Sequence, residues 1–339
     1  MKKFKFIAVT VALIIFAALF SGCGSSKDAK PADTAAKAGA AAPPAKKIQL
    51  RVGGSTTGTW IYGFSAAWAE VINQKVPEVS LVVQATAGSS SHYAMLQRDE
   101  LDFGTGSTSS EYAAINGGFN FKEKFTNFAV LMPVTTSVGH IFVLADSPIQ
   151  KQEDLDGKKV AIGARGSPTS VVAEMTFEAI GVKPKYVTST VEEMMEMLRD
   201  KRVDAGAYYV GSPFSQMLDL SSSTPIRLIP FTDAHLEKAK AKIPFFANGT
   251  ITEKDYNWLK APVPTLKGYQ TMIVNPKVPE DIVYKISKAT WENYDAIVKS
   301  VPAFGKVTAN DVVNLYGKVH PGAAKYYQEK GVKIPDSMK

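Results

Sequence analysis

The chain is poor in the residues that build disulfide frameworks and metal centres. Its 339 residues include one cysteine, Cys23, so no disulfide can form within the chain. Only four histidines are present, and neither an H-E-x-x-H pattern nor a Cys/His cluster occurs. The nucleophile pattern G-x-S-x-G is absent as well. We therefore expect no metal, no cofactor and no catalytic residue, and we keep an extracytoplasmic hydrolase as an alternative.

The N-terminal segment has the pattern of an export signal. Met1-Lys-Lys-Phe-Lys5 is basic, residues 6–20 are almost wholly apolar, and Ser21-Gly22-Cys23 follows. This apolar run is too short to span a membrane, and small residues after it are typical of a signal peptide. Gly22-Cys23 resembles a bacterial lipoprotein signal, although Phe20 stands where leucine is usual. We predict a lipoprotein signal over residues 1–22, lipidation of Cys23, and an extracytoplasmic chain anchored to a bacterial membrane.

The next segment and the charge restrict the partners. Residues 24–47 are rich in Ala, Lys, Ser and Pro and contain no aromatic residue, so we expect a disordered tether over 23–47. Removal of Lys2, Lys3 and Lys5 with the signal lowers the formal charge from +7 to +4. A mildly basic domain without a clustered basic patch does not indicate nucleic-acid binding.

Three small polar loops follow predicted strands in the first half of the mature chain. The strands are expected at residues 48–52, 79–84 and 101–104, and the loops at 53–59, 85–91 and 105–110. Gly53 and Gly58 have the spacing of a phosphate loop, but Thr59-Trp60 follows where Lys-Ser/Thr is required, so a nucleotide site is disfavoured. In open α/β sheets, ligands bind at the loops that follow the carboxyl ends of the strands. The alternative for the loop at 53–59 is an ordinary turn that caps a helix. The candidate ligand-binding residues here are Ser55, Thr56, Thr57, Thr59, Trp60, Gly88, Ser89, Ser90, Thr105, Gly106 and Ser107.

The same strand, loop and helix order recurs further along. Strands are expected at residues 159–163, 185–188 and 203–207, with helices at 170–180 and 191–200. Met95-Leu96, Asp102 and Gly104 fall on identical residues when the sequence is shifted by 102 positions. The candidate ligand-binding residues of this second half are Arg165, Gly166, Ser167, Thr169, Tyr208 and Tyr209.

The repeat predicts the fold class. We expect two similar α/β lobes facing each other across a ligand cleft, with lobe 1 over residues 48–137 and lobe 2 over 138–245. Residues 246–339 are expected to return across the hinge, with a strand at 270–274 and a long helix from 279 to about 299, while 231–259 looks irregular. A single large doubly wound domain is the competing architecture.

Several motifs together resemble one family. The stretches LRVGGSTTGTW (50–60), QATAGS (84–89), LDGKKVAIG (155–163), VDAGA (203–207) and VPEDIVY (278–284), and the closing HPGA (320–323), occur in this order. They are similar to the TAXI solute-binding receptors of tripartite ATP-independent periplasmic (TRAP) transporters. The resemblance implies a two-lobed periplasmic-binding-protein fold of the type II-like, Venus-flytrap kind. It also implies a receptor, not an enzyme, that binds a small-molecule solute and delivers it to TRAP permease membrane subunits, and we expect it to be a monomer.

The resemblance implies a carboxylate or amino acid such as glutamate or glutamine, but the loops depart from the family pattern. Ser91 and His92 stand where an acidic residue and Asn are frequent, and the second loop carries Arg165 and Pro168. We expect the loop hydroxyls and helix ends to bind a carboxylate, Arg165 to add a bidentate contact, and Trp60 and the two tyrosines to form an apolar wall. A ligand-sensing or adhesive surface lipoprotein stays open as a further alternative.

Overall fold

The computed structural model describes residues 47–118, 121, 123–299 and 307–339. The predicted signal peptide, Cys23 and all but the last residue of the predicted tether lie outside the described residues. The compact unit that carries the fold spans Ala45–Lys339. No helix among the described residues is long and apolar enough to cross a membrane.

One mixed ten-stranded sheet runs through this unit, with the strand order β2-β1-β3-β10-β4-β7-β5-β6, while β8 pairs with β4 and β9 with β10. β1 pairs in parallel with β2 and β3, and β5 does so with β6 and β7, whereas β4 and β10 are antiparallel to their neighbours. The strands are β1 (Ile48–Gly53), β2 (Val79–Gln84), β3 (Phe103–Ser107), β4 (Ala129–Leu144), β5 (Lys159–Ile162), β6 (Lys185–Thr188), β7 (Ala205–Val210), β8 (Ile226–Leu228), β9 (Ala247–Ile251) and β10 (Val263–Val274).

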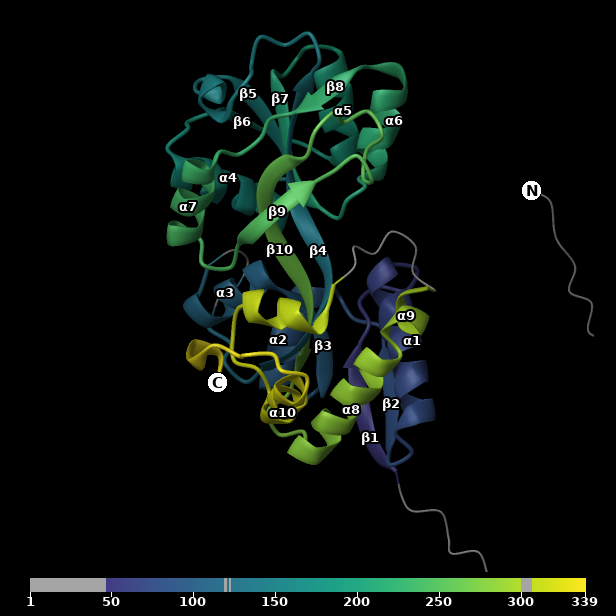
Figure 1. Cartoon of the computed structure of the whole chain (residues 1–339). Helices are drawn as coiled ribbons and strands as arrows, with labels where there is room; N and C mark the ends of the chain where they lie inside the picture. Colours follow the sequence, from purple (N-terminus) through teal and green to yellow (C-terminus); the bar gives the residue numbers. More distant parts are fainter. Residues whose placement is uncertain (1–46, 119–120, 122, 300–306) are drawn as a thin grey trace, which may run out of the picture. The chain divides into compact units, whose positions relative to one another are not determined.

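Two lobes form along this sheet, and Figure 1 shows the long strands β4 and β10 running through both. Lobe 1 contains β1–β3, and lobe 2 contains β5–β9. The helices of lobe 1 are α1 (Trp60–Lys75), α2 (Ser89–Gln97), α3 (Thr108–Asn116), α8 (Glu280–Glu292), α9 (Tyr294–Lys299) and α10 (Pro321–Glu329). Those of lobe 2 are α4 (Pro168–Ile180), α5 (Val191–Arg199), α6 (Ser215–Ser223) and α7 (Asp233–Lys242). Short 3-10 turns occur as η1 (Gln152–Leu155), η2 (Ala309–Asn314) and η3 (Asp336–Met338).

Each lobe has its own apolar core. In lobe 1, Phe64, Trp68 and Ile72 of α1 are fully buried in one cluster with residues of α8 and α10. The Trp68 indole N–H donates to Thr290 Oγ1 at 2.8 Å, which ties α1 to α8 across 222 positions of sequence. In lobe 2, Phe177 of α4 packs in a second cluster with residues of β5 and β7. The C-terminal helices therefore complete the core of lobe 1.

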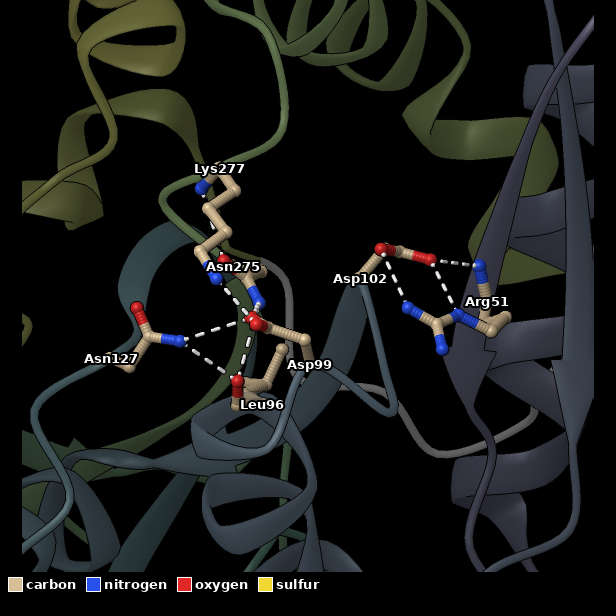
Figure 2. Close-up of polar contacts among 7 residues, drawn as sticks. All are labelled: Arg51, Leu96, Asp99, Asp102, Asn127, Asn275 and Lys277. Carbon is tan, nitrogen blue, oxygen red and sulfur yellow. Dashed lines mark hydrogen bonds and ion pairs between the residues drawn. The ribbon is translucent and has the colours of Figure 1, made fainter.

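The predicted internal repeat is present as a repeated turn before β3 and β7. Asp102 accepts the Arg51 backbone N–H at 2.7 Å, and Asp204 accepts the Lys159 backbone N–H at 2.8 Å. Asp99 and Lys201, also 102 positions apart, both have positive φ, at 56° and 55°. Figure 2 shows that in lobe 1 the Arg51 guanidinium also binds the Asp102 carboxylate, with Nε 3.0 Å from Oδ2.

The structure differs from the sequence prediction at several boundaries. The 16-residue strand β4 was not predicted, because Pro133 and the polar residues 135–137 interrupt its apolar run. Residues 105–107 belong to β3 and not to a loop, and the loop expected over 85–91 ends earlier because α2 begins at Ser89. The region 231–259 contains α7 and β9, and the helix expected over 279–299 is divided at Asn293 into α8 and α9.

Candidate functional site

Two adjoining cavities lie where the lobes meet at β4 and β10. The larger has a volume of about 460 Å³ and the smaller about 80 Å³. Ser137 of β4, Tyr209 of β7 and Gln270 of β10 line both, so the cavities share one wall. A volume of several hundred cubic ångströms is typical of a small-molecule site. We treat the two cavities together as the candidate site.

Five helices begin at residues that line these cavities. The larger cavity is lined by Trp60, Val191 and Ser215, the first residues of α1, α5 and α6. The smaller is lined by Thr108 and Pro168, the first residues of α3 and α4. Helix N-termini carry partial positive charge, so their convergence favours an anion. Side-chain caps accept one backbone N–H at the start of α1, α3, α4 and α5, whereas α6 has no side-chain cap. None of the described residues that line either cavity has a charged side chain.

In lobe 1 a buried histidine supports the polar loops. His92 is fully buried, and its Nε2 lies 2.7 Å from Thr86 Oγ1, which also accepts the Ser55 backbone N–H at 3.0 Å. The Thr105 backbone N–H donates to His92 Nδ1 at 3.0 Å. Burial lowers the pKa of His92 below its ordinary value, which favours the neutral ring. His92 thus joins the loops after β1 and β2 to strand β3.

In lobe 2 an aromatic cluster lines the larger cavity and is supported by a buried histidine. The rings of Tyr208 and Phe214 stack with centroids 5.5 Å apart and an interplanar angle of 9°. The Phe214 backbone N–H donates to Tyr256 Oη at 2.7 Å, and Tyr256 Oη lies 2.9 Å from His140 Nε2. His140 Nδ1 donates to the Val138 carbonyl at 3.0 Å, so Nε2 accepts the Tyr256 hydroxyl proton. Burial lowers the pKa of His140 to about 4, which keeps this ring neutral at pH 7.

The strands between the lobes supply the rest of the wall. Thr135, Thr136 and Ser137 of β4 line the larger cavity beside Gln270 of β10. Neighbouring register shifts interrupt the β10–β4 pairing at Gln270/Thr271 and Met272/Ile273. Among the described residues, no hydrogen-bond partner occurs for the Gln270 side-chain amide, which leaves it able to bind a solute. Gly139 is required nearby, because a Cβ there would lie 2.8 Å from the Tyr209 ring.

The structure brings five of the predicted site residues to the cavities. Trp60 and Tyr208 line the larger one, Ser107 and Thr169 the smaller one, and Tyr209 both. The others line neither cavity: Ser55, Thr56, Thr57, Thr59, Gly88, Ser89, Ser90, Thr105, Gly106, Arg165, Gly166 and Ser167.

Several predicted hydroxyl groups act within the fold. Thr59, Ser107 and Ser167 are the N-caps of α1, α3 and α4, and each side chain accepts a backbone N–H of the first turn. The Ser89 and Thr105 hydroxyls bind each other at 3.0 Å. Arg165 is exposed, and its contact with a solute stays a prediction. The three N-cap hydroxyls therefore fix the starts of helices whose first residues line the cavities.

Sequence reasoning missed the contribution of the connecting strands and of several lobe 2 aromatics. The missed lining residues include Thr135, Thr136, Ser137, Gln270, Phe214, Phe245 and Phe246. The Thr-Thr-Ser run was a usable signal, because three hydroxyl residues interrupt an otherwise apolar segment of β4. None of the four histidines lines either cavity, and no cluster of metal-binding side chains occurs in the part of the chain that the structure describes.

Residues 52–331 match the NMT1-like family, which is most of the chain. The chain belongs to the NMT1-like family. Among solved structures, the chain is similar to a TctC solute-binding protein from Polaromonas, with 16% identity, a TM-score of 0.55, and coverage of 85% of this chain and 99% of that one. It is also similar to XAC2383 from Xanthomonas citri bound to ATP, with 11% identity, a TM-score of 0.51, and coverage of 84% and 95%. At these identities the likeness shows the fold alone: a two-lobed α/β solute-binding-protein architecture, as the sequence predicted.

Proposed function

We propose that this protein is an extracytoplasmic solute-binding protein that captures a small organic anion between its lobes and delivers it to the membrane components of a transporter. The observation that carries the proposal is the cavity pair at which five helices begin and whose described lining residues bear no charge. The family and the fold of the Polaromonas solute-binding protein support it.

Helix ends and hydroxyl groups supply the binding energy in this proposal. Each helix N-terminus stabilises a nearby anion by about 0.3–1 kcal/mol when exposed and up to ~2 kcal/mol when partly buried. Each good hydrogen bond from a group such as Ser137 or Gln270 adds about 0.5–1.5 kcal/mol. Since the helices come from both lobes, an anion binds the closed arrangement better than an open one and shifts the equilibrium toward closure.

A finer assignment rests on the sequence. The motifs at residues 50–60, 155–163 and 278–284 resemble TAXI receptors, so we assign the protein to a TRAP transporter with a carboxylate as its solute. Lipidation of Cys23 would hold the receptor at the membrane. If Cys23→Ala protein stays fully in the membrane fraction of cells, that anchor is wrong.

The direct test is a thermal-shift screen of the purified protein against monocarboxylates, dicarboxylates, keto acids, hydroxy acids and amino acids. A solute at one hundred times its Kd stabilises the folded protein by about 2.7 kcal/mol through mass action. We expect at least one organic anion to raise Tm reversibly without being turned over. No shift with any organic anion would contradict the proposed function, and turnover of an ester or amide would favour the hydrolase.

A further inference from the structure

The larger cavity is enclosed by aromatic side chains from both lobes. Trp60 comes from lobe 1, while Tyr208 and Phe214 come from lobe 2. Trp60 is 42% exposed, so it is not a core residue of lobe 1. Tyr208 is partly buried, and one face of its ring is covered by the stacked ring of Phe214. A flat apolar group in this cavity would therefore meet aromatic surfaces from two sides.

The lobe 2 side of this enclosure is held in place from behind. The Phe214 ring packs against buried His140 at a centroid distance of 5.8 Å, and its backbone N–H is fixed by Tyr256. Tyr256 is itself fully buried and stacks on Trp258 at 5.2 Å. Rigid aromatic walls bind a complementary solute without a large ordering cost.

The charge of the enclosure also restricts the solute. The described lining residues include no carboxylate that could pair with an ammonium group. Burying an unpaired ammonium is strongly unfavourable, and helix N-termini repel positive charge. For an α-amino acid, the unfavourable free energy of burying the ammonium group would therefore offset much of the favourable binding free energy of its carboxylate.

We propose that the solute is an organic anion with a flat aromatic or conjugated body and no ammonium group. The carboxylate binds at the helix ends, and the flat body lies between Trp60 and the Tyr208–Phe214 stack. This inference rests on the proposed function and narrows its solute class away from glutamate.

Titration calorimetry with four solutes separates the effect of the aromatic ring from that of the ammonium group. The solutes are phenyllactate, phenylalanine, 2-hydroxyglutarate and glutamate. Phenyllactate has the ring without the ammonium group, and each of the others lacks one or both of these features. We expect phenyllactate to bind at least tenfold more tightly than each of the other three. Equal or tighter binding of 2-hydroxyglutarate or glutamate would overturn the aromatic inference and leave the proposed function standing, and equal binding of phenylalanine would overturn the ammonium part.

If none of the four binds while the screen finds an organic anion that lacks a flat body or carries an ammonium group, the inference fails alone. If no organic anion binds at all, the inference and the proposed function fail together. These outcomes distinguish the two claims.

Variants locate the aromatic contact. Trp60→Ala should weaken phenyllactate binding at least tenfold, and Trp60→Phe should retain most of it. Tyr186→Ala is the matched control, since Tyr186 is 38% exposed in lobe 2 and lines neither cavity. Unliganded Tm values of the Trp60 variants close to that of the wild type would show that folding is intact. Unchanged phenyllactate affinity in Trp60→Ala would contradict the inference.

Discussion

The two lobes repeat one strand-and-helix frame but surround the cleft with different chemistry. Asp102 and Asp204 each accept a backbone N–H of a neighbouring strand, from β1 and β5 respectively, and a positive-φ residue precedes each aspartate. Behind the cleft, however, lobe 1 buries His92 against Thr86 and Thr105, whereas lobe 2 buries His140 among aromatic rings. The difference teaches that the repeat fixes the frame, while the residues near the strand ends give each lobe its own chemistry around the cleft.

The largest expected effect concerns a buried carboxyl in lobe 1 that has no counterpart among the described residues of lobe 2. Glu111 of α3 is fully buried, and its carboxyl accepts the Thr271 hydroxyl and, at 3.1 Å, the Tyr316 backbone N–H. Burial raises the pKa of Glu111 from 4.5 to about 8, so the folded state retains this proton at neutral pH.

The Glu111 contribution to stability is therefore fully present below pH 4.5 and is lost as the pH rises to about 8. A shift of this size corresponds to about 5 kcal/mol. We expect the wild type to lose free energy of unfolding between these pH values relative to Glu111→Gln, as measured by urea denaturation. Parallel pH profiles of the two proteins would contradict a neutral buried Glu111.

A smaller effect is expected on the free energy of unfolding when either buried histidine is replaced. His140→Ala removes a ring from an aromatic core and leaves the Tyr256 hydroxyl without its acceptor, at a cost of about 3–4 kcal/mol. His92→Ala should cost about 1–2 kcal/mol, because the partly exposed Ser89 and Thr86 nearby let water replace the ring. Denaturant unfolding of both variants measures this. Equal costs would remove the distinction between a polar and an aromatic lobe.

The His140 pKa gives this comparison a pH signature. The pKa of His140 is lowered from 6.5 to about 4 in the folded state. The contribution of His140 to the free energy of unfolding is therefore fully present above pH 6.5 and is lost as the pH falls toward 4. The loss amounts to about 3 kcal/mol. It should be absent in His140→Ala, and an unaltered acid profile in that variant would contradict the assignment.

The smallest effect tests the repeated turn itself. The Asp99 carboxylate accepts Asn275 Nδ2–H at 2.9 Å and pairs with the ammonium of Lys277, and so ties the turn to the end of β10 (Figure 2). The Lys201 side chain binds only exposed Asp146 among the described residues. Glycine adopts a positive φ without strain, so Lys201→Gly should leave Tm unchanged or slightly raised. Asp99→Gly should lower Tm, since it removes these contacts. Similar Tm changes in both variants would show that the turns are equivalent.

Much of the frame could be predicted from the sequence. β2 and β6 have the predicted bounds, and Gly181 ends α4 with a φ of 82°, because local periodicity and cap residues determine such features. β4 could not be predicted in this way, since its polar centre makes sense only where two lobes meet over a cavity.

The site was predicted less well than the frame. Trp60, Ser107, Thr169, Tyr208 and Tyr209 reach the cavities, but hydroxyls such as Thr59 and Ser167 are used as helix caps. A hydroxyl after a strand suits a cap and a ligand equally well, and only the three-dimensional arrangement separates the two roles. Gln270 was missed although a strand at 270–274 was expected to return across the hinge, because nothing in the local sequence shows that its first residue lines a cavity.

The most direct test of the central claim places a negative charge on the wall that both cavities share. The test anion is the organic anion that gives the largest thermal shift with the wild type. Gln270→Glu should lower the affinity for this anion at least a hundredfold, as measured by titration calorimetry. Gln328→Glu, the same change at an exposed position of α10, should leave its affinity unaltered. Unchanged affinity in a folded Gln270→Glu protein would contradict the claim that the anion binds between the lobes.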